Sequence, residues 1–260
     1  MTQRVTLERR GATAIITVNR PETLNALDMA TLAELDARVG EADRDDSVRV
    51  VVFTGAGKSA FVAGGDIADL ASRRGLPHYL ELAERLHSVF NRIERLDKPT
   101  IGAVNGWALG GGTELLLCLD IRFAAASAKL GLPEITLGMF PGAGGSQRLI
   151  RQIPLCKAKE LMFAGDRITA AEAERLGLVN KVVEDAKLND EVFALADRIA
   201  AKSPLTLKLL KRTLADGYEM PLRAALRHEH AMISLVLDSQ DAHEGCAAFL
   251  EKRQAAFRGE

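Results

Sequence analysis

The segment Thr100-Ile-Gly-Ala-Val-Asn-Gly-Trp-Ala-Leu-Gly-Gly-Gly-Thr-Glu114 decides how this chain folds. Residues 100–104 form a largely apolar run after Pro99, which predicts a strand buried on both faces. A glycine-rich turn follows, and Gly110 to Gly112 open a helix that continues through Leu115-Leu-Leu-Cys118. A buried strand that passes through glycines into a helix is typical of an α/β protein.

The same alternation of strands and helices extends on both sides of this segment. Leucine, valine and isoleucine recur at steps of three and four residues between Leu82 and Leu96, which predicts an amphipathic helix. Similar spacing predicts a helix over residues 29–42. Strands separated by helices need crossover connections, and this favours an α/β core over a sandwich. The other predicted strands are residues 5–9, 12–18, 48–54 and 121–125.

The last third of the chain is predicted to be mainly helical. Thr169-Ala-Ala-Glu172 fits a capping box, and Ser203-Pro204 fits an N-cap followed by proline at the first helical position. The predicted helices are residues 186–201, 205–214, 222–237 and 241–257. We expect a core of residues 1–200 that carries the site. Residues 201–260 would form a helical region that is not an independent domain and that meets a partner subunit.

Composition excludes several classes of protein. The chain has 260 residues, of which 47% are hydrophobic and 27% charged, as in ordinary globular proteins rather than disordered ones. Its 34 basic and 35 acidic residues argue against a nucleic-acid-binding surface. The longest uncharged stretch, residues 99–113, is too short and glycine-rich to span a membrane. Three scattered cysteines and a start without the apolar core of a signal peptide predict a cytoplasmic protein.

Two nucleotide-binding patterns and a metal site are also disfavoured. Thr54-Gly-Ala-Gly-Lys-Ser59 resembles the end of a phosphate-binding P-loop, but Val52 stands where that pattern needs a glycine. Gly142-Ala-Gly-Gly-Ser-Gln147 lacks the third glycine of a dinucleotide fingerprint. The histidines form no ligand constellation, so no metal is expected; they are His78, His87, His228, His230 and His243.

Most of the 22 glycines lie in the middle third, where three glycine-bordered segments stand out. They are residues 61–67, residues 105–114, and residues 131–134 with 140–148 close behind. Each of the first two follows a buried strand and leaves backbone N–H groups with little side chain to block approach. Side by side, such turns can aim two N–H donors at one oxygen and stabilise a developing enolate. The alternative is that the glycines only permit tight turns and close packing.

Two glutamates in these segments are candidates for proton transfer. Glu114 precedes four apolar residues, and Glu134 follows Pro133 in an almost uncharged neighbourhood. Apolar surroundings raise the pKa of a carboxyl group toward the range useful for catalysis. Two carboxyl groups near one another tend to divide the acid and base roles. The alternative is two surface glutamates at helix starts, where negative charge is favourable.

Taken together, these residues resemble the enoyl-CoA hydratase/isomerase (crotonase) superfamily, and within it the enoyl-CoA hydratases. The resemblance covers nearly the whole chain. It runs from Asn19-Arg-Pro-Glu-Thr-Leu-Asn-Ala-Leu27 through the glycine-bordered segments to residues 165–173, 176–180 and 249–253. It implies an α/β fold, a spiral of ββα turns, followed by a helical C-terminal region that builds a homotrimer or a dimer of trimers.

The resemblance also implies the reaction. The substrate would be an acyl-CoA thioester, with coenzyme A as part of the substrate and no separate cofactor. Its carbonyl oxygen would lie between the N–H groups of Ala63 and Gly111. Glu114 would help to hold and deprotonate a water molecule, and Glu134 would give a proton to the α-carbon. The product of this hydration would be a 3-hydroxyacyl-CoA, as in fatty acid β-oxidation.

Further residues are expected to contact the substrate or the coenzyme. Arg20 and Lys252 are candidates for the coenzyme A phosphates, Lys252 by reaching a neighbouring subunit's ligand, and either could equally be a solvated surface charge. Asp66 is expected to order its own turn rather than to transfer protons. Trp107 and Phe140 either line the acyl pocket or simply pack. The full substrate-binding set is Ala26, Gly64, Gly65, Asp66, Ile67, Trp107, Gly110, Phe140 and Gly142.

Two alternatives remain open at the level of the sequence. Within the family, the chain could be another hydratase, dehydratase or isomerase for branched or cyclic acyl groups, since the same carboxyl pair serves these reactions. Leu132, Thr113 and Gly65 stand where glutamine, cysteine and alanine are frequent in such hydratases, which leaves the acyl preference open. Outside catalysis, the alternative is an RNA-binding protein on the same fold, which the balanced charge and the glutamate pair disfavour.

Overall fold

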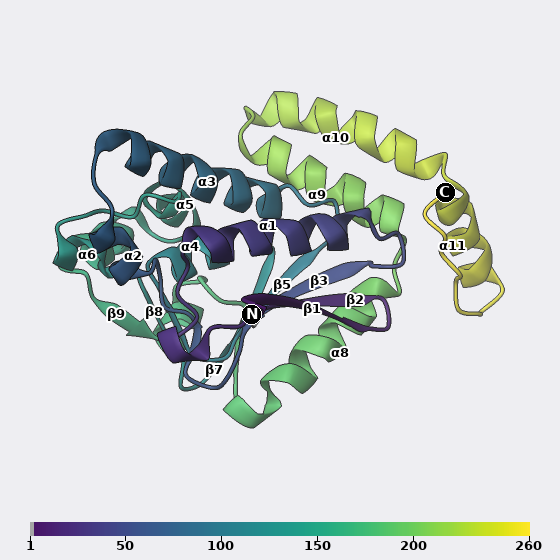
Figure 1. The fold of residues 1–260 in the computed structure, drawn as a ribbon. Coiled ribbons are helices and arrows are strands. Elements are labelled where there is room, and N and C mark those ends of the chain that lie inside the picture. The colour runs from purple at the N-terminus through teal and green to yellow at the C-terminus, as the bar shows by residue number, and fades with distance from the viewer. Residues whose placement is uncertain (1–2) are drawn as a thin grey trace.

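The computed structural model describes residues 3–260, and its centre is a six-stranded sheet (Figure 1). The strand order is β1-β2-β3-β5-β7-β10; β1 and β2 are antiparallel and the remaining neighbours are parallel. The apolar runs predicted as buried strands occupy its middle. The bounds are β1 (Val5–Arg10), β2 (Thr13–Val18), β3 (Val50–Gly55), β5 (Thr100–Val104), β7 (Ile121–Ala125) and β10 (Lys181–Val183).

A second sheet of four short strands runs beside the first. Its order is β4-β6-β8-β9, with β4, β6 and β8 parallel and β9 antiparallel to β8. Each of β4, β6 and β8 follows a strand of the large sheet and is followed by a helix, so the chain advances by one ββα unit per turn. This arrangement confirms the predicted spiral. The bounds are β4 (Ala60–Val62), β6 (Trp107–Leu109), β8 (Lys129–Gly131) and β9 (Arg167–Thr169).

Helices cover both faces of the large sheet, as Figure 1 shows. Alternate residues of β3 enter two separate cores because successive side chains of a strand point to opposite faces. Val51 and Phe53 pack in the core that includes α1 (Met29–Arg44) and α3 (Leu76–Glu94), whereas Val50 and Val52 pack against α8 (Leu188–Ala200). The short helices are η1 (Pro21–Thr23), α2 (Ile67–Ser72), α4 (Gly111–Leu117), η2 (Pro133–Leu137), α5 (Gly145–Gln152), α6 (Leu155–Ala164), α7 (Ala170–Arg175) and η3 (Asp185–Lys187).

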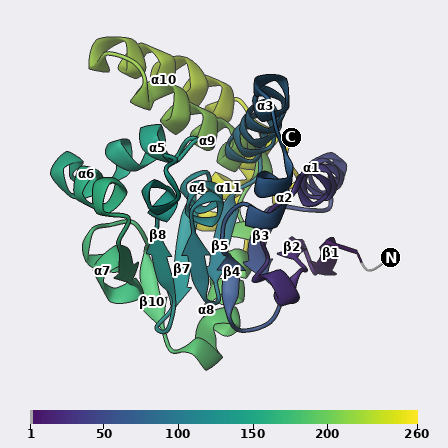
Figure 2. The same cartoon turned by 60° about the vertical axis from the view of Figure 1, so that its left-hand side comes forward.

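The chain ends in three helices that extend from one side of the core (Figures 1 and 2). They are α9 (Pro204–Tyr218), α10 (Leu222–Leu237) and α11 (Gln240–Leu250). Ser203 caps α9 as expected, because its side chain accepts a hydrogen bond from Thr206 N. Ion pairs fasten α9 to the core, and no residue of α9 or α10 is buried.

The last predicted helix ends earlier than residue 257. The chain turns back after Leu250 because polar groups of α11 bind the following segment. Asp241 accepts hydrogen bonds from Arg258 N and Gly259 N, at 2.7 and 2.8 Å, and Glu244 pairs with Arg253. The expectation that residues 201–260 are not an independent domain stays a prediction. Across residues 3–260, none of the helices combines the length and the apolar character needed to cross a membrane.

Candidate active site

The glycine-bordered segments meet where the parallel strands of the small sheet end. Residues 63–66 follow β4, α4 follows β6, and η2 follows β8. Because these three strands are neighbours, the segments that follow them lie side by side at one edge of the sheet. Gly110 N donates to Gly131 O at 2.9 Å, and a Cβ atom at Gly110 would lie 3.7 Å from Gly64 Cα. The fold therefore gathers all three predicted segments into one site.

Glu114 lies in the first turn of α4 and is almost fully buried, with 4% of its surface exposed. Its Oε1 accepts hydrogen bonds from Ala143 N at 2.7 Å and Gly145 N at 2.8 Å, at the start of α5. Burial raises the pKa of Glu114, while the two amides and the positive charge of Arg148 oppose that shift. Neither hydrogen bond uses Oε2, so this oxygen is left for a ligand.

Glu134 lies in η2 and has very different surroundings. Both of its carboxyl oxygens are shielded from solvent, yet neither has a hydrogen-bond partner among residues 3–260. Burial raises the pKa of Glu134 to about 7, and the negative charge of Glu114 adds to this shift. A carboxyl group with this pKa carries a proton for much of the time at neutral pH.

The turn between β6 and α4 requires glycine. Gly110 has φ +52°, a conformation that residues with a side chain rarely adopt. A Cβ atom there would also come within 3.2 Å of Glu134 Oε1. At Gly112 a Cβ atom would lie 1.8 Å from Val62 O, a clash with the backbone that excludes any side chain. These glycines let the backbone of α4 approach both β4 and the Glu134 carboxyl group.

Two unused backbone N–H groups lie beside the carboxyl pair. Gly65 N and Gly111 N donate to no acceptor within residues 3–260. The two groups are close, because a Cβ atom at Gly111 would lie 3.6 Å from Gly65 N. Gly111 is the first residue of α4, where the helix dipole adds positive potential. The pair can therefore bind one developing negative charge.

The prediction that Ala63 supplies one of these donors is wrong. Its N–H donates to Leu24 O at 3.1 Å, so it is occupied. Leu27 pairs with the same segment through two hydrogen bonds of 2.8 Å: Leu27 N donates to Gly64 O, and Asp66 N donates to Leu27 O. These two hydrogen bonds use the residues before and after Gly65, so the N–H group of Gly65 stays unused. The unused N–H group therefore lies two residues further along the chain than the predicted donor.

The comparisons with known proteins agree with this architecture. The model of the family described as enoyl-CoA hydratase/isomerase matches residues 8–260. This chain belongs to that family.

Individual relatives of this enoyl-CoA hydratase/isomerase family member match it over nearly its full length. It is 41% identical to a short-chain-enoyl-CoA hydratase of Clostridium acetobutylicum, over 96% of this chain and 95% of the relative. It is 42% identical to a crotonyl-CoA hydratase of Syntrophomonas wolfei, over 98% of each. The crystal structure of an enoyl-CoA hydratase from Bacillus anthracis superimposes with a TM-score of 0.96 at 38% identity, covering 99% of this chain and all of that one.

Arg20 serves neither of the roles expected of it in this family member. Its guanidinium donates to Ala26 O at 2.8 Å and to Asp66 Oδ2 at 2.9 Å, and it lies 3.3 Å from Asp28 Oδ2. The side chain is nearly buried, so it is neither a solvated charge nor free to bind a phosphate. Arg20 instead fastens residues 20–28 to the segment that carries Gly65.

Asp66 orders its own turn, as predicted. Its side chain accepts hydrogen bonds from Ala68 N and Asp69 N at the start of α2. The hydrogen bond from Arg20, and to a smaller extent these amides, hold the pKa of Asp66 below its usual range. Asp66 therefore stays ionised and is a poor proton donor.

The remaining expected contacts divide between the rim of the site and the opposite side of the molecule. Ala26 is buried, whereas Phe140 is 74% exposed and Gly142 and Ile67 are also open to solvent. The ring of Trp107 lies 5.2 Å from the guanidinium of Arg167.

Lys252 follows α11, far across the molecule from α4 in Figure 1. Its contact with a coenzyme A phosphate stays a prediction, and that contact would need a neighbouring subunit.

Sequence reasoning missed the groups that hold Glu114. Ala143 N and Gly145 N lie in a segment in which only Phe140 and Gly142 were expected to have a role, in substrate binding. The signal was present, because Gly142-Ala-Gly-Gly145 opens a helix and the first amides of a helix have no partner within it. Arg148 was missed as well, since nothing in the sequence shows which acid it meets.

Proposed function

We propose that this protein is an enoyl-CoA hydratase that adds water in the syn sense to a trans-2-enoyl-CoA and yields a 3-hydroxyacyl-CoA. The observation that carries the proposal is the unequal carboxyl pair. Glu114 accepts two amide hydrogen bonds, whereas the carboxyl oxygens of Glu134 have no partner and its pKa is about 7. One group is suited to accept a proton and the other to donate one.

The two backbone donors would polarise the substrate. With the thioester oxygen between Gly65 N–H and Gly111 N–H, electron density moves from the β-carbon toward that oxygen. Donors fixed by the backbone need little reorganisation during the reaction, and each is typically worth about 3 kcal/mol in the transition state. Family membership and the unused amides support this assignment.

The two glutamates would then divide the proton transfers. Glu114 Oε2 holds a water molecule and takes one of its protons while the water oxygen bonds to the β-carbon. The electron pair of the double bond moves onto the thioester as an enolate. The enolate collapses as its α-carbon takes the proton of Glu134. Glu114 ends protonated and Glu134 ionised, and exchange with solvent resets both groups.

The test is turnover by Glu134→Gln, which keeps the shape of the side chain but has no proton to give. We expect kcat to fall by about 10²-fold or more, with acyl-CoA binding close to that of the wild type. Glu219→Gln, at an exposed position of the C-terminal region, is the matched control and should be silent. Turnover by Glu134→Gln at the wild-type rate would contradict the proposal.

Substrate range is measured with the same assay. Loss of enoyl-CoA absorbance across straight-chain, branched and cyclic substrates would separate a short-chain hydratase from one for branched or cyclic acyl groups. A relative in Escherichia coli named 2,3-dehydroadipyl-CoA hydratase, 38% identical, makes dicarboxylic acyl chains a useful addition to this panel. No turnover of any substrate, together with salt-dependent RNA binding, would favour the noncatalytic alternative.

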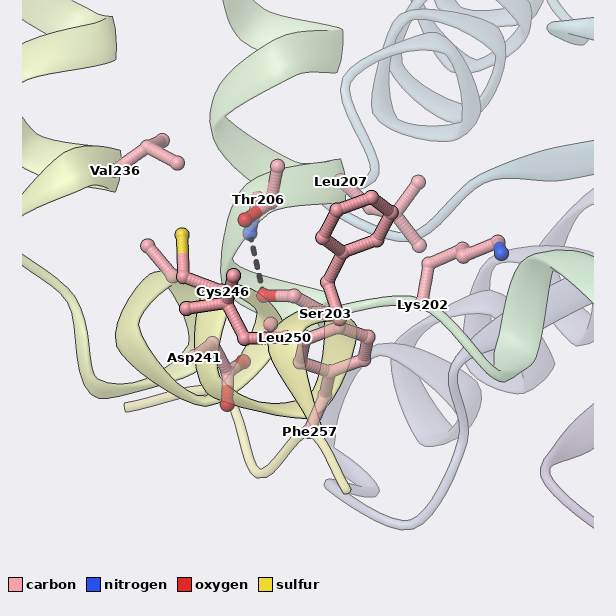
Figure 3. Close-up of a pocket in the computed structure, with 12 residues that line it drawn as sticks. Lys202, Ser203, Thr206, Leu207, Val236, Asp241, Cys246, Leu250 and Phe257 are labelled. Atoms are coloured by element: carbon pink, nitrogen blue, oxygen red, sulfur yellow. Dashed lines mark hydrogen bonds between the residues drawn. The ribbon is translucent and has the colours of Figure 1, made fainter. Parts of the chain in front are cut away.

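We also propose that the C-terminal helices form a homotrimer or a dimer of trimers. Large apolar side chains lie open on α10 and α11, among them Leu222 and Phe249 at 74% and 83% exposure. A cavity of about 760 Å³, lined mainly by apolar side chains, lies between α9, α10 and α11. Figure 3 shows its lining residues, which do not include either glutamate of the pair. Single chains rarely leave so much apolar surface in water. Native mass spectrometry that finds a stable monomer would contradict this assignment.

A further inference from the structure

Arg148 is an unusually constrained arginine beside the proposed active site. Its Nε and Nη2 donate to the two carboxyl oxygens of Glu94 on α3, at 2.9 and 2.7 Å. Nη2 also donates to Asn91 Oδ1 at 2.7 Å. The arginine side chain is 13% exposed, so the guanidinium is largely removed from solvent, whereas its partner Glu94 is 42% exposed. Such pairs hold a guanidinium in one orientation.

The same guanidinium holds the turn that binds Glu114. Arg148 Nη1 donates to Ala143 O at 3.3 Å, while Ala143 N donates to Glu114 Oε1. Residue 143 is therefore held on one side by the arginine and on the other by the glutamate. Gly145 N, the second donor to Glu114, lies two residues further along this turn.

Gly144 makes this close approach possible. A Cβ atom at Gly144 would lie 1.9 Å from Arg148 Nη1, and the residue has φ +104°. A side chain at this position would push the guanidinium away from the turn. Because residue 144 has no side chain, the guanidinium of Arg148 lies directly against the backbone that carries the amide donors.

We propose that Arg148, fixed by Glu94, is a positioning residue that holds residues 143–145 against Glu114 and keeps Glu114 the ionised member of the carboxyl pair. The inference rests on the proposed function for the role of Glu114. It has two separable parts, one geometric and one electrostatic, and Arg148 touches neither substrate nor reacting atoms in either part.

The charged groups around Glu114 support the electrostatic part. The negative charge of Glu114 raises the pKa of Glu134 on η2, so the two carboxyl groups disfavour ionising together. Cys118, directly after α4, stays neutral, because burial raises the pKa of its thiol to about 12. The packed strands β4 and β6 contribute only apolar residues, and Glu94 on α3 faces Arg148. Arg148 is the cation that lowers the pKa of Glu114.

The first variant is Arg148→Gln, which removes the charge and the pair with Glu94. Because the proposed base must be ionised, its acid limb in kcat/KM should move to higher pH, by about one unit for loss of a nearby opposite charge. At pH 6 kcat should fall several-fold with KM little changed. Arg151→Gln is the matched control, since Arg151 is more exposed and lies on the same helix.

Two more variants separate geometry from charge. Arg148→Lys keeps the charge and should leave the acid limb near that of the wild type, with a reduced kcat because the two-pronged pair is lost. Glu94→Gln keeps the positive charge of Arg148 but weakens the pair that fixes its orientation. It should lower kcat without moving the acid limb of kcat/KM to higher pH. An upward shift in Glu94→Gln as large as in Arg148→Gln would overturn the electrostatic part. Wild-type kcat in a folded Glu94→Gln protein would overturn the geometric part.

A readout without substrate keeps this inference distinguishable from the proposed function. The carboxyl carbon of Glu114, assigned with Glu114→Gln in protein labelled with ¹³C-glutamate, should titrate at higher pH in Arg148→Gln than in the wild type. An unshifted titration in folded Arg148→Gln would overturn the electrostatic part of the inference even for an active hydratase. A shifted titration in a protein that turns over no enoyl-CoA would instead overturn the proposed function.

Discussion

The two carboxyl groups of the site lie close together but in opposite surroundings. Around Glu114, the start of α5 supplies two amide donors and Arg148 supplies a positive charge. Around Glu134, the described part of the chain supplies no donor and no cation pairs with it. Burial raises both pKa values, but at Glu114 two amides of another segment and the charge of Arg148 oppose the shift, whereas at Glu134 only its own backbone amide does so. The same residue type is thus prepared for two tasks by its neighbours alone.

This contrast shows where the chemistry of the site is controlled. The sequence does not show which of the two glutamates is ionised. What distinguishes them is whether backbone amides point at the carboxyl group, and this depends on the turn at residues 142–145 and on the approach of Gly110. Perturbing either feature should therefore change the division of roles more than a distant substitution of similar size.

The largest of the following effects is expected for Gly110→Ala. The new Cβ atom would lie 3.2 Å from Glu134 Oε1, so the carboxyl group should be displaced. The alanine would also have to adopt φ +52°. We expect kcat to fall about tenfold or more, since small misplacements of a catalytic group are costly.

Gly11→Ala is the matched control for this variant. Gly11 has φ +57° but open space where the Cβ atom would lie. Gly11→Ala therefore also places a side chain at positive φ, at a cost of roughly 1 kcal/mol, but without a clash at the site. Equal kcat values in the two variants would show that the approach of Gly110 to Glu134 is unimportant.

The pH profile gives a smaller effect. Glu134 must be protonated to act as the acid, so kcat/KM for hydration should fall as the pH rises through about 7. Between pH 7 and pH 8 the protonated fraction drops about fivefold. Because the two carboxyl groups interact, the measured limbs belong to the pair. A rate that stays flat from pH 6 to pH 9 would contradict the assigned roles.

The smallest effect is on stability. The pKa of Glu134 is about 7 in the folded protein against 4.5 for a free glutamate, so the folded state holds this proton more tightly. That stabilisation is complete below about pH 4.5 and is lost as the pH rises through 7. Glutamine at this position stays neutral at every pH. At pH 8 Glu134→Gln should therefore be more stable than the wild type by about 1 kcal/mol after solvent screening, which raises the melting temperature by about 2–4 °C. At pH 4 the two melting temperatures should coincide, and a wild type that melts higher at pH 8 would contradict the pKa shift.

Much of the fold could be predicted because its signals are local. The apolar runs became β3, β5 and β7, and the regular spacing between Leu82 and Leu96 lies largely within α3. The caps at Thr169 and Ser203 form as expected. Each of these features depends on residues within a few positions of one another, which is the range in which sequence patterns are informative.

The site was predicted in part, and its errors share one cause. Glu114, Glu134 and Gly111 meet as expected, but the free amide belongs to Gly65 rather than Ala63. Arg20 meets Asp66, which is 46 residues away along the chain. In both cases the outcome depends on a hydrogen bond to a distant segment. Hydrogen bonds of this kind have no local signature, so spacing alone could not have revealed them.

The use of peptide amides at Gly65 and Gly111 has a consequence for how such a fold can diversify. Backbone donors do not titrate and survive almost any mutation, with proline the clear exception. Side chains that carry protons or contact the acyl chain can therefore be exchanged while the grip on a thioester is retained. Evolution could obtain a new reaction here by altering a single acid.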